Sequence, residues 1–233
     1  MEKIIVAGKT IESYLTKSKI GQFAINPYVG CPHACKYCYA SFMKRFTGHS
    51  ESWGDFIDIK RTRHKINGSQ ITGKNVFMGT VTDCYNPYEA KYGITRSILE
   101  QLVGVDCYLQ IATKNKLILR DLDLLKKMKR LSVALSVNTL DENLRQDMDR
   151  ASTVWERLET LRTLHENGIY TILFISPIFI GITDWKAIIE TSHNVVSEYW
   201  FEDLNLRGGY KNVIMQYVRE NYPDSYPLFE RIY

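Results

Sequence analysis

The sequence lacks a long apolar run, and this absence excludes a transmembrane helix of ordinary length. The longest candidate covers residues 169–182, which is shorter than the roughly 18 uninterrupted apolar residues that a span needs. Ser176, Pro177 and Gly181 also interrupt it. Near the N-terminus, charged side chains occupy the region that would be apolar in a signal peptide. We therefore expect a cytoplasmic protein with no membrane as a partner.

Low-complexity tracts, internal repeats and a strong charge imbalance are also absent. Aromatic residues make up 12% of the chain, which excludes a disordered protein. The absence of an internal repeat excludes solenoids and propellers. The net charge of +4 permits an anionic ligand or a transient nucleic-acid contact but requires neither. The 233 residues suit one domain or two small ones, and they are enough to fold without a disulfide or a structural metal.

Apolar segments that predict strands alternate with amphipathic segments that predict helices. The predicted strands cover residues 22–28, 75–81, 107–112, 132–137, 170–175 and 198–206. The predicted helices are one that begins near Tyr39, one over residues 94–103, one capped by Asp121, one that carries Trp155, Leu158, Leu161 and Leu164, one capped by Asp184, and one over residues 211–220.

This alternation favours crossover units and a parallel sheet. Because six such units are two short of a closed eight-stranded barrel, we predict an α/β fold with an open, partial (β/α)6 barrel, with a doubly wound sheet as the alternative. We expect an N-terminal extension over residues 1–20, the partial barrel over residues 21–210, and a C-terminal helix and tail over residues 211–233 that pack on the barrel.

Three of the five cysteines fall within eight residues, in the stretch NPYVGCPHACKYCYA. Cys31, Cys35 and Cys38 have the spacing C-x3-C-x2-C, and in a reducing compartment such a cluster predicts a metal site rather than a disulfide framework. Three thiolates on one short loop can hold three irons of an iron–sulfur cubane, which leaves the fourth iron open.

A structural zinc site is the alternative interpretation of the same cysteines. Zinc requires four protein ligands, and the fourth would have to be His33 within the loop, or Cys84 or Cys107 from elsewhere in the fold. A zinc or iron–sulfur module of this kind would serve binding or interaction instead of catalysis.

The cysteine spacing, with aromatic residues on both sides of the last cysteine, resembles the radical S-adenosylmethionine (SAM) enzymes. The flanks NPYVGC and CYA resemble the branch that includes spore photoproduct lyase. Together with SFMKRFTGH, GTVTDCYNP, SVNTLDE and NLRGG, they make the chain similar to the small radical SAM mobile pair proteins over residues 22–222.

The resemblance implies a partial (β/α)6 barrel with a 4Fe–4S cluster in the loop after the first strand. SAM would bind the open iron, and its reductive cleavage would give methionine and a 5′-deoxyadenosyl radical that takes a hydrogen atom from an unknown substrate. The reaction would be that of a lyase, an oxidoreductase or a transferase. The implied partners are a reductant such as flavodoxin or ferredoxin and a second radical SAM protein encoded nearby; nucleic acid, through lesion repair or base modification, is an alternative substrate.

Polar residues follow the apolar runs at one end of each predicted strand, where parallel barrels carry their ligand sites. These strand-end residues are Thr82, Asp83, Thr113, Lys114, Ser136, Asn138, Ser176, Glu202 and Asn205. By resemblance, the SAM-binding residues are Tyr39, Thr82, Asp83, Lys114, Ser136, Pro177 and Ile178. The amino end of SAM is assigned to Thr82 and Asp83. Its carboxylate and ribose are assigned to Lys114, for which a solvated loop lysine is the alternative.

Cys84 stands where related small proteins often have proline. A thiol at this position is a candidate catalytic hydrogen-atom donor, whereas a small buried side chain is the alternative. The donor cysteine of the photoproduct lyase pattern falls at Val81, and this difference counts against thymine-dimer reversal. We expect Cys107 to be part of the core. Arg150 and Arg157 are candidates for binding an anionic group or for solvated helix positions.

Overall fold

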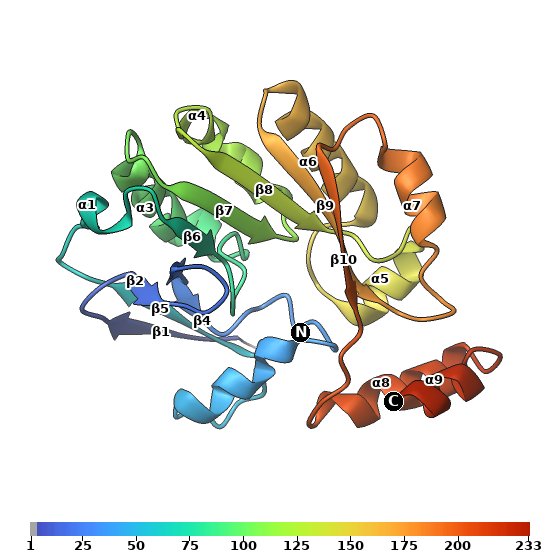
Figure 1. The fold of residues 1–233 in the computed structure, drawn as a ribbon. Coiled ribbons are helices and arrows are strands. Elements are labelled where there is room, and N and C mark those ends of the chain that lie inside the picture. The colour runs from blue at the N-terminus through green and yellow to red at the C-terminus, as the bar shows by residue number, and fades with distance from the viewer. Residues whose placement is uncertain (1–3) are drawn as a thin grey trace.

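The computed structural model describes residues 4–233, and its main sheet has seven strands (Figure 1). Their order is β10 (Glu198–Asp203), β9 (Tyr170–Ile178), β8 (Leu131–Ser136), β7 (Tyr108–Thr113), β6 (Asn75–Met78), β3 (Phe23–Ile25) and β2 (Leu15–Lys17). From β3 to β10 every neighbouring pair is parallel and the strands follow in chain order, with β4 and β5 inserted between β3 and β6; β2 is antiparallel to β3. The predicted open, partial (β/α)6 barrel is therefore confirmed, and the sheet does not close.

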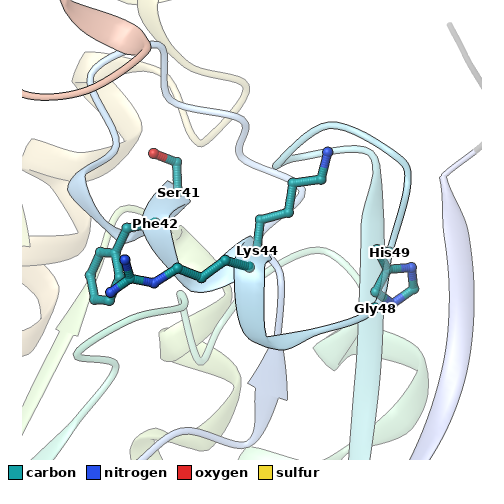
Figure 2. Close-up of a pocket in the computed structure, with 6 residues that line it drawn as sticks. Ser41, Phe42, Lys44, Gly48 and His49 are labelled. Atoms are coloured by element: carbon teal, nitrogen blue, oxygen red, sulfur yellow. The ribbon is translucent and has the colours of Figure 1, made fainter.

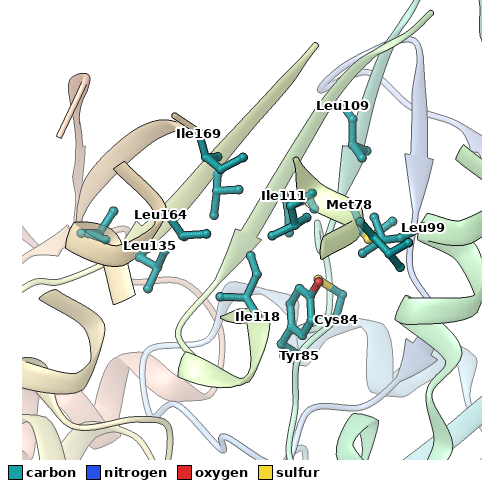
Figure 3. Packing of buried hydrophobic residues seen from close by; sticks show 14 of the residues in the cluster. Met78, Cys84, Tyr85, Leu99, Leu109, Ile111, Ile118, Leu135, Leu164 and Ile169 are labelled. Carbon is teal, nitrogen blue, oxygen red and sulfur yellow. The ribbon is translucent and has the colours of Figure 1, made fainter. Parts of the chain in front are cut away.

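Helices cover one face of this sheet (Figure 1). They include α3 (Ile94–Leu102), α4 (Leu122–Leu125), α6 (Val154–Glu166) and α7 (Trp185–Ser192). Alternate strand residues such as Ile111 and Leu135 point toward the helices and pack with Leu99 and Leu164 in the main core (Figure 3). The residues between them face the inside of the open barrel. Within residues 4–233, no helix is both long and apolar enough to cross a membrane.

A second apolar cluster lies beyond the carboxyl ends of the strands, where the C-terminal helices sit (Figure 1). The other helical elements are η1 (Tyr39–Phe46), α1 (Gly68–Ile71), α2 (Glu89–Tyr92), η2 (Lys116–Asp121), α5 (Glu142–Met148), α8 (Tyr210–Asn221) and α9 (Tyr226–Ile232). Ile214 and Val218 of α8 and Phe229 of α9 belong to the same cluster as Tyr37 of the cysteine segment and Leu144 of α5. The C-terminal helices therefore pack against the region that carries the cysteines.

A separate three-stranded sheet was not predicted. It pairs β1 (Ile5–Thr10) in parallel with β5 (Phe56–Arg61), and β4 (Tyr28–Val29) joins β5 in the antiparallel sense. The segment predicted as one strand over residues 22–28 is thus divided between the two sheets. Pro27 stands at the division, and because proline has no backbone N–H it cannot continue a ladder.

Of the two aspartates predicted to cap helices, one does so in the structure and the other does not. Asp184 caps α7 as predicted, because its side chain accepts a hydrogen bond from the Ala187 amide at 3.0 Å. Asp121 makes no such cap on α4; its carboxylate instead pairs with Arg96 at 2.9 Å and with Arg120 at 2.7 Å. Because Arg96 belongs to α3 and Arg120 to η2, this buried carboxylate joins the two elements.

The buried stripe of α6 also differs from the prediction. It runs through Val154, Leu158 and Leu161, whereas Trp155 is 60% exposed. Residues at positions i, i+4 and i+7 share one helix face, and Trp155 is rotated away from it by one residue.

Candidate active site

The cysteine loop covers residues 30–38 and connects β4 to η1. Gly30 begins it with a φ of +83°, and a Cβ there would lie 2.3 Å from the Phe56 carbonyl oxygen, so only glycine fits. Two tight turns follow, in which Ala34 N–H donates to Cys31 O and Cys38 N–H donates to Cys35 O, each at 3.1 Å. These turns wind the chain so that the three cysteines lie within electrostatic reach of one another.

The three thiols have an unfavourable environment for ionisation. Burial, together with the nearby Asp83 and Cys38, raises the pKa of Cys31 to about 12. Burial and the charge of Asp149 raise the pKa of Cys35 well above its usual value, and burial also raises that of Cys38. Thiolates are the ligating form, and a bound cation deprotonates coordinating thiols. The donor set therefore fits a positively charged metal group that compensates for burial.

Buried polar atoms without hydrogen-bond partners lie in this loop and in the segments that follow η1 and β8. Within residues 4–233, they include His33 Nδ1, Trp53 Nε1 and Asn138 Nδ2. The Trp53 indole faces Cys38 and is among the groups that lower the pKa of its thiol. Because iron–sulfur clusters accept hydrogen bonds on their sulfurs, an indole N–H at this place fits such a group. In the described part of the chain, no three His, Cys, Asp or Glu residues are grouped as ligands of a single ion.

Asp83 ties three loops together beside the cysteines. It accepts hydrogen bonds from Thr113 Oγ1 at 2.7 Å, from the Lys114 amide at 2.8 Å and from the Tyr85 amide at 2.8 Å. Its other neighbour is His33, whose Nε2 lies 3.2 Å from Oδ2. Although burial opposes ionisation, the charge of His33 and these hydrogen bonds hold the pKa of Asp83 below its usual value. The carboxylate is thus an ionised junction between the cysteine loop and the ends of β6 and β7.

Lys114 extends from the end of β7 toward the cysteines. Its ammonium lies 5.9 Å from the centroid of the Tyr37 ring, and its charge lowers the pKa of both Cys35 and Cys38. The structure therefore places the half-buried Lys114 next to the predicted metal ligands.

Tyr39 connects the cysteine loop to the far end of the sheet. Its hydroxyl donates to the Thr80 carbonyl oxygen, and burial together with the charges of Cys38 and Glu202 raises its pKa to about 12. Glu202, at the end of β10, accepts a hydrogen bond from Ser176 Oγ of β9 at 2.6 Å. These contacts bring Tyr39 and the carboxyl ends of β9 and β10 to the same edge.

The remaining predicted SAM contacts lie along that edge in varied surroundings. Thr82 Oγ1 donates to the Gly30 carbonyl oxygen at 2.6 Å, so this hydroxyl supports the start of the cysteine loop. Ser136 and Pro177 are buried, and Pro177 follows a cis peptide bond. Ile178 is half-buried and packs against the main core. The edge therefore gathers the predicted residues, and several of their polar atoms already bind protein groups.

Cys84 lies on the opposite side of the sheet edge, in the core. It is fully buried, belongs to the main apolar cluster, and its Sγ lies 4.0 Å from the Ala112 carbonyl oxygen (Figure 3). Burial raises the pKa of this thiol well above its usual value. These surroundings favour the packing role over that of a hydrogen-atom donor. Cys107 is part of the same cluster, as expected.

Arg157 is not a free anion site. It is 1% exposed, and its guanidinium donates to Ser152 O at 2.8 Å, to Ser136 O at 3.2 Å and to Asp149. Arg150, in contrast, is exposed. Sequence reasoning did not single out Asp149, because an aspartate after a short helix carries no signal of its partners.

The segment that follows η1 docks on β5. His49 stacks on Phe56 with ring centroids 3.9 Å apart, and its Nε2 lies 2.8 Å from Asp58 Oδ1. A surface hollow of about 560 Å³ opens beside it, lined by Ser41, Phe42, Lys44, Arg45, Gly48 and His49 (Figure 2). None of the cysteines lines this hollow, so it is separate from the site described above.

Comparison with known families decides the classification of this site. A family model described as the radical SAM superfamily matches residues 25–191, which contain the cysteine loop and the strand ends up to β9. The chain belongs to the radical SAM superfamily. An uncharacterised protein of Methanocaldococcus jannaschii, MJ0683, is 38% identical over 91% of this chain and 81% of its own length. An uncharacterised Mycobacterium tuberculosis protein, Rv2578c, is 24% identical over 91% of this chain and 67% of its own length.

Solved structures show the same radical SAM fold. A spore photoproduct lyase variant with bound AdoMet and dinucleoside spore photoproduct gives a TM-score of 0.68 at 14% identity. The match covers 94% of this chain and 66% of that one. Streptococcus suis SuiB bound to S-adenosylmethionine gives a TM-score of 0.54 at 13% identity, over 99% of this chain and 49% of that one. At these identities the likeness concerns the fold alone.

Proposed function

We propose that this radical SAM protein is an enzyme that binds a 4Fe–4S cluster through Cys31, Cys35 and Cys38 and binds SAM along the carboxyl ends of its parallel strands. When bound, the cluster supplies the electron that cleaves SAM into methionine and a 5′-deoxyadenosyl radical, which abstracts a hydrogen atom from a substrate. The electron would come from an external reductant such as flavodoxin or ferredoxin.

The observation that carries this proposal is the meeting of three desolvated thiols with the Lys114 ammonium, at the edge of the sheet where Asn138 also follows β8. Burial disfavours each thiolate, so the loop is suited to a cationic metal group. Lys114 lies beside these thiols, and Asn138, which is 3% exposed, has an unpartnered Nδ2 within the described residues. Both are donors toward an anionic or hydroxyl-bearing ligand.

The chain's own residues divide the work of binding. The Lys114 ammonium would pair with the carboxylate of SAM, since a charge-assisted hydrogen bond is roughly twice as strong as a neutral one. Ser136, the last residue of β8, and Asn138, which follows it, would bind the ribose hydroxyls. Asp83 has both oxygens engaged, so we assign it the task of holding the Lys114 backbone and the cysteine loop in register. Pro177, which is buried, would limit access of water at the far side.

The decisive experiment is anaerobic reconstitution with iron and sulfide, followed by reduction with dithionite in the presence of SAM. We expect about four irons and four sulfides per chain, and 5′-deoxyadenosine as a product on chromatography. Cys31→Ala, Cys35→Ala and Cys38→Ala should each abolish product formation and lower the bound iron.

A matched control is Cys107→Ala, because Cys107 is a buried cysteine of the core at the start of β7. This variant should keep the cluster and the product. Bound zinc without iron would refute the proposal and support the interaction module. A loaded cluster that never yields 5′-deoxyadenosine, with or without added reductant proteins, would refute the enzymatic part.

Nucleic acid as the substrate is disfavoured by the inner face of β10. Tyr199 contacts Ser192 of α7, so Glu198, Trp200 and Glu202 face the inside of the open barrel. Carboxylates in this position repel a phosphodiester backbone, which binds cationic grooves. We expect weak, salt-sensitive DNA binding with no preference for damaged strands. Fluorescence anisotropy with intact and ultraviolet-damaged duplexes measures this. Tighter binding of the damaged duplex would support nucleic acid as the substrate.

A further inference from the structure

A buried ion pair stands directly behind the cysteine loop. Asp149 and Arg157 are 3% and 1% exposed, and Arg157 Nη2 donates to Asp149 Oδ1 at 2.5 Å. Pairs of this kind add little to stability, because the cost of removing two charges from water offsets their attraction. Their position is therefore more informative than their strength.

The segment that carries Asp149 lies against the cysteine loop. Lys36 N–H donates to Met148 O at 2.9 Å, and Arg150 N–H donates to His33 O at 2.7 Å. Between these two backbone bonds, the Tyr37 hydroxyl donates to Asp149 Oδ2 at 3.2 Å. Residues 148–150 thus form a rigid backing for residues 33–37.

The two opposite charges both stand against the loop. Asp149 contacts it directly through the hydrogen bond from the Tyr37 hydroxyl, and Arg157 lies behind Asp149, to which its guanidinium donates. Buried charges are poorly screened by salt, so their effect persists under physiological conditions.

We propose that Asp149 and Arg157 are positioning residues that hold the cysteine loop and together set the reduction potential of its cluster, Asp149 making the cluster harder to reduce and Arg157 making it easier. This inference rests on the proposed function. The reduction potential of an iron–sulfur cluster depends on the net charge around it. Reduction adds one electron from an external donor, and no bond or proton transfer is required, so surrounding charge acts on it directly.

The test is a redox titration of the reconstituted protein, followed by electron paramagnetic resonance. Asp149→Asn should shift the potential to more positive values and Arg157→Gln to more negative ones. Each shift should be on the order of tenfold in the reduced-to-oxidised ratio, or ~59 mV for one electron. The double variant, which removes both charges, should return close to the wild-type value.

A purely structural role would behave differently, because loosening the loop would move both single variants in the same direction. Shifts of the same sign, or none in a loaded protein, would overturn the proposal. Asp147→Asn is the matched control: Asp147 lies two residues away, is exposed, and accepts from the Tyr217 hydroxyl at 2.7 Å. It should leave the potential unchanged. Arg157→Lys keeps the charge, and a folded protein with this change should also retain the wild-type potential.

The two possible failures are distinguishable. If the wild type takes up no cluster, the proposed function fails and this inference fails with it. If the cluster loads, the proposed iron–sulfur site stands, and the signs of the two potential shifts alone decide whether the pair acts on the loop.

Discussion

Removal of the Asp83 carboxylate should destabilise the protein more than any surface substitution. Asp83→Ala leaves the Thr113 hydroxyl, the Lys114 amide and the Tyr85 amide without their buried acceptor. It also deprives His33 of its neighbouring charge. Each hydrogen bond to a charged group contributes ~1.5–3 kcal/mol, and removing one partner of a buried pair costs about 3–5 kcal/mol. We expect a loss of about 4 kcal/mol in the free energy of unfolding and, at 2–4 °C per kcal/mol, a fall in Tm of about 8–16 °C.

The same carboxylate should leave a signature in the pH dependence of stability. Its pKa in the folded protein lies below the ordinary value of 3.8, despite burial, because of His33 and its hydrogen bonds. A depressed carboxyl pKa stabilises the fold above the unfolded value, and that contribution disappears as the pH falls through the folded value. Asp83→Asn should lack this acid-sensitive contribution and show a flatter curve below about pH 4.

Urea unfolding of the cluster-free protein, followed by circular dichroism at several pH values, measures both effects. Asp106→Asn is the control, because Asp106 forms an exposed pair with Arg130 at 3.0 Å. Such surface pairs contribute at most about 1 kcal/mol. The reasoning would be refuted if Asp83→Ala cost less than about 1 kcal/mol, or if Asp83→Asn and the wild type lost stability in parallel on acidification.

Two further predictions concern buried groups outside the candidate site. Cys84→Ala should lower stability by about 1–2 kcal/mol through a small cavity and leave 5′-deoxyadenosine formation unchanged; abolished turnover in a folded, cluster-loaded variant would restore a catalytic role for Cys84. Burial and the nearby charge of Lys9 lower the pKa of Lys60 to about 8. The unfolded chain keeps that proton to higher pH, so the folded state gains stability as the pH rises from about 8 to about 10. Urea unfolding should therefore show the wild type becoming more stable relative to Lys60→Met over this range. A difference in unfolding free energy that does not change with pH would contradict this prediction.

Local pattern was sufficient to predict the parallel sheet and the polar residues at the carboxyl ends of its strands. The strand segments from residue 75 onward are bounded by turn residues, and Asp184 caps α7 in the predicted way. The cysteine spacing depends on three residues within one loop, so it too could be found without any knowledge of distant contacts.

Features that depend on distant partners could not be predicted. β1 pairs with β5 across more than 40 residues, and nothing in the sequence of either strand specifies the other. Arg157 looks like any exposed helix arginine until Asp149 and the Ser136 carbonyl oxygen meet it. The contacts of Asp83 with the end of β7 and with His33 of the cysteine loop could not be predicted either, because only the folded chain brings these segments together.

The distance along the chain between the cysteine loop and its backing has a consequence for biosynthesis. Tyr37 and Asp149, which hydrogen-bond in the folded protein, are separated by 112 residues. At the usual 5–20 residues per second of translation, those residues take about 6–22 s to be made. Throughout that interval the three cysteines are exposed on a nascent chain without the support of Asp149. If the proposed cluster is inserted, iron and sulfide delivered during that interval would meet an unsupported loop, and we expect productive loading only after α6 has been synthesised.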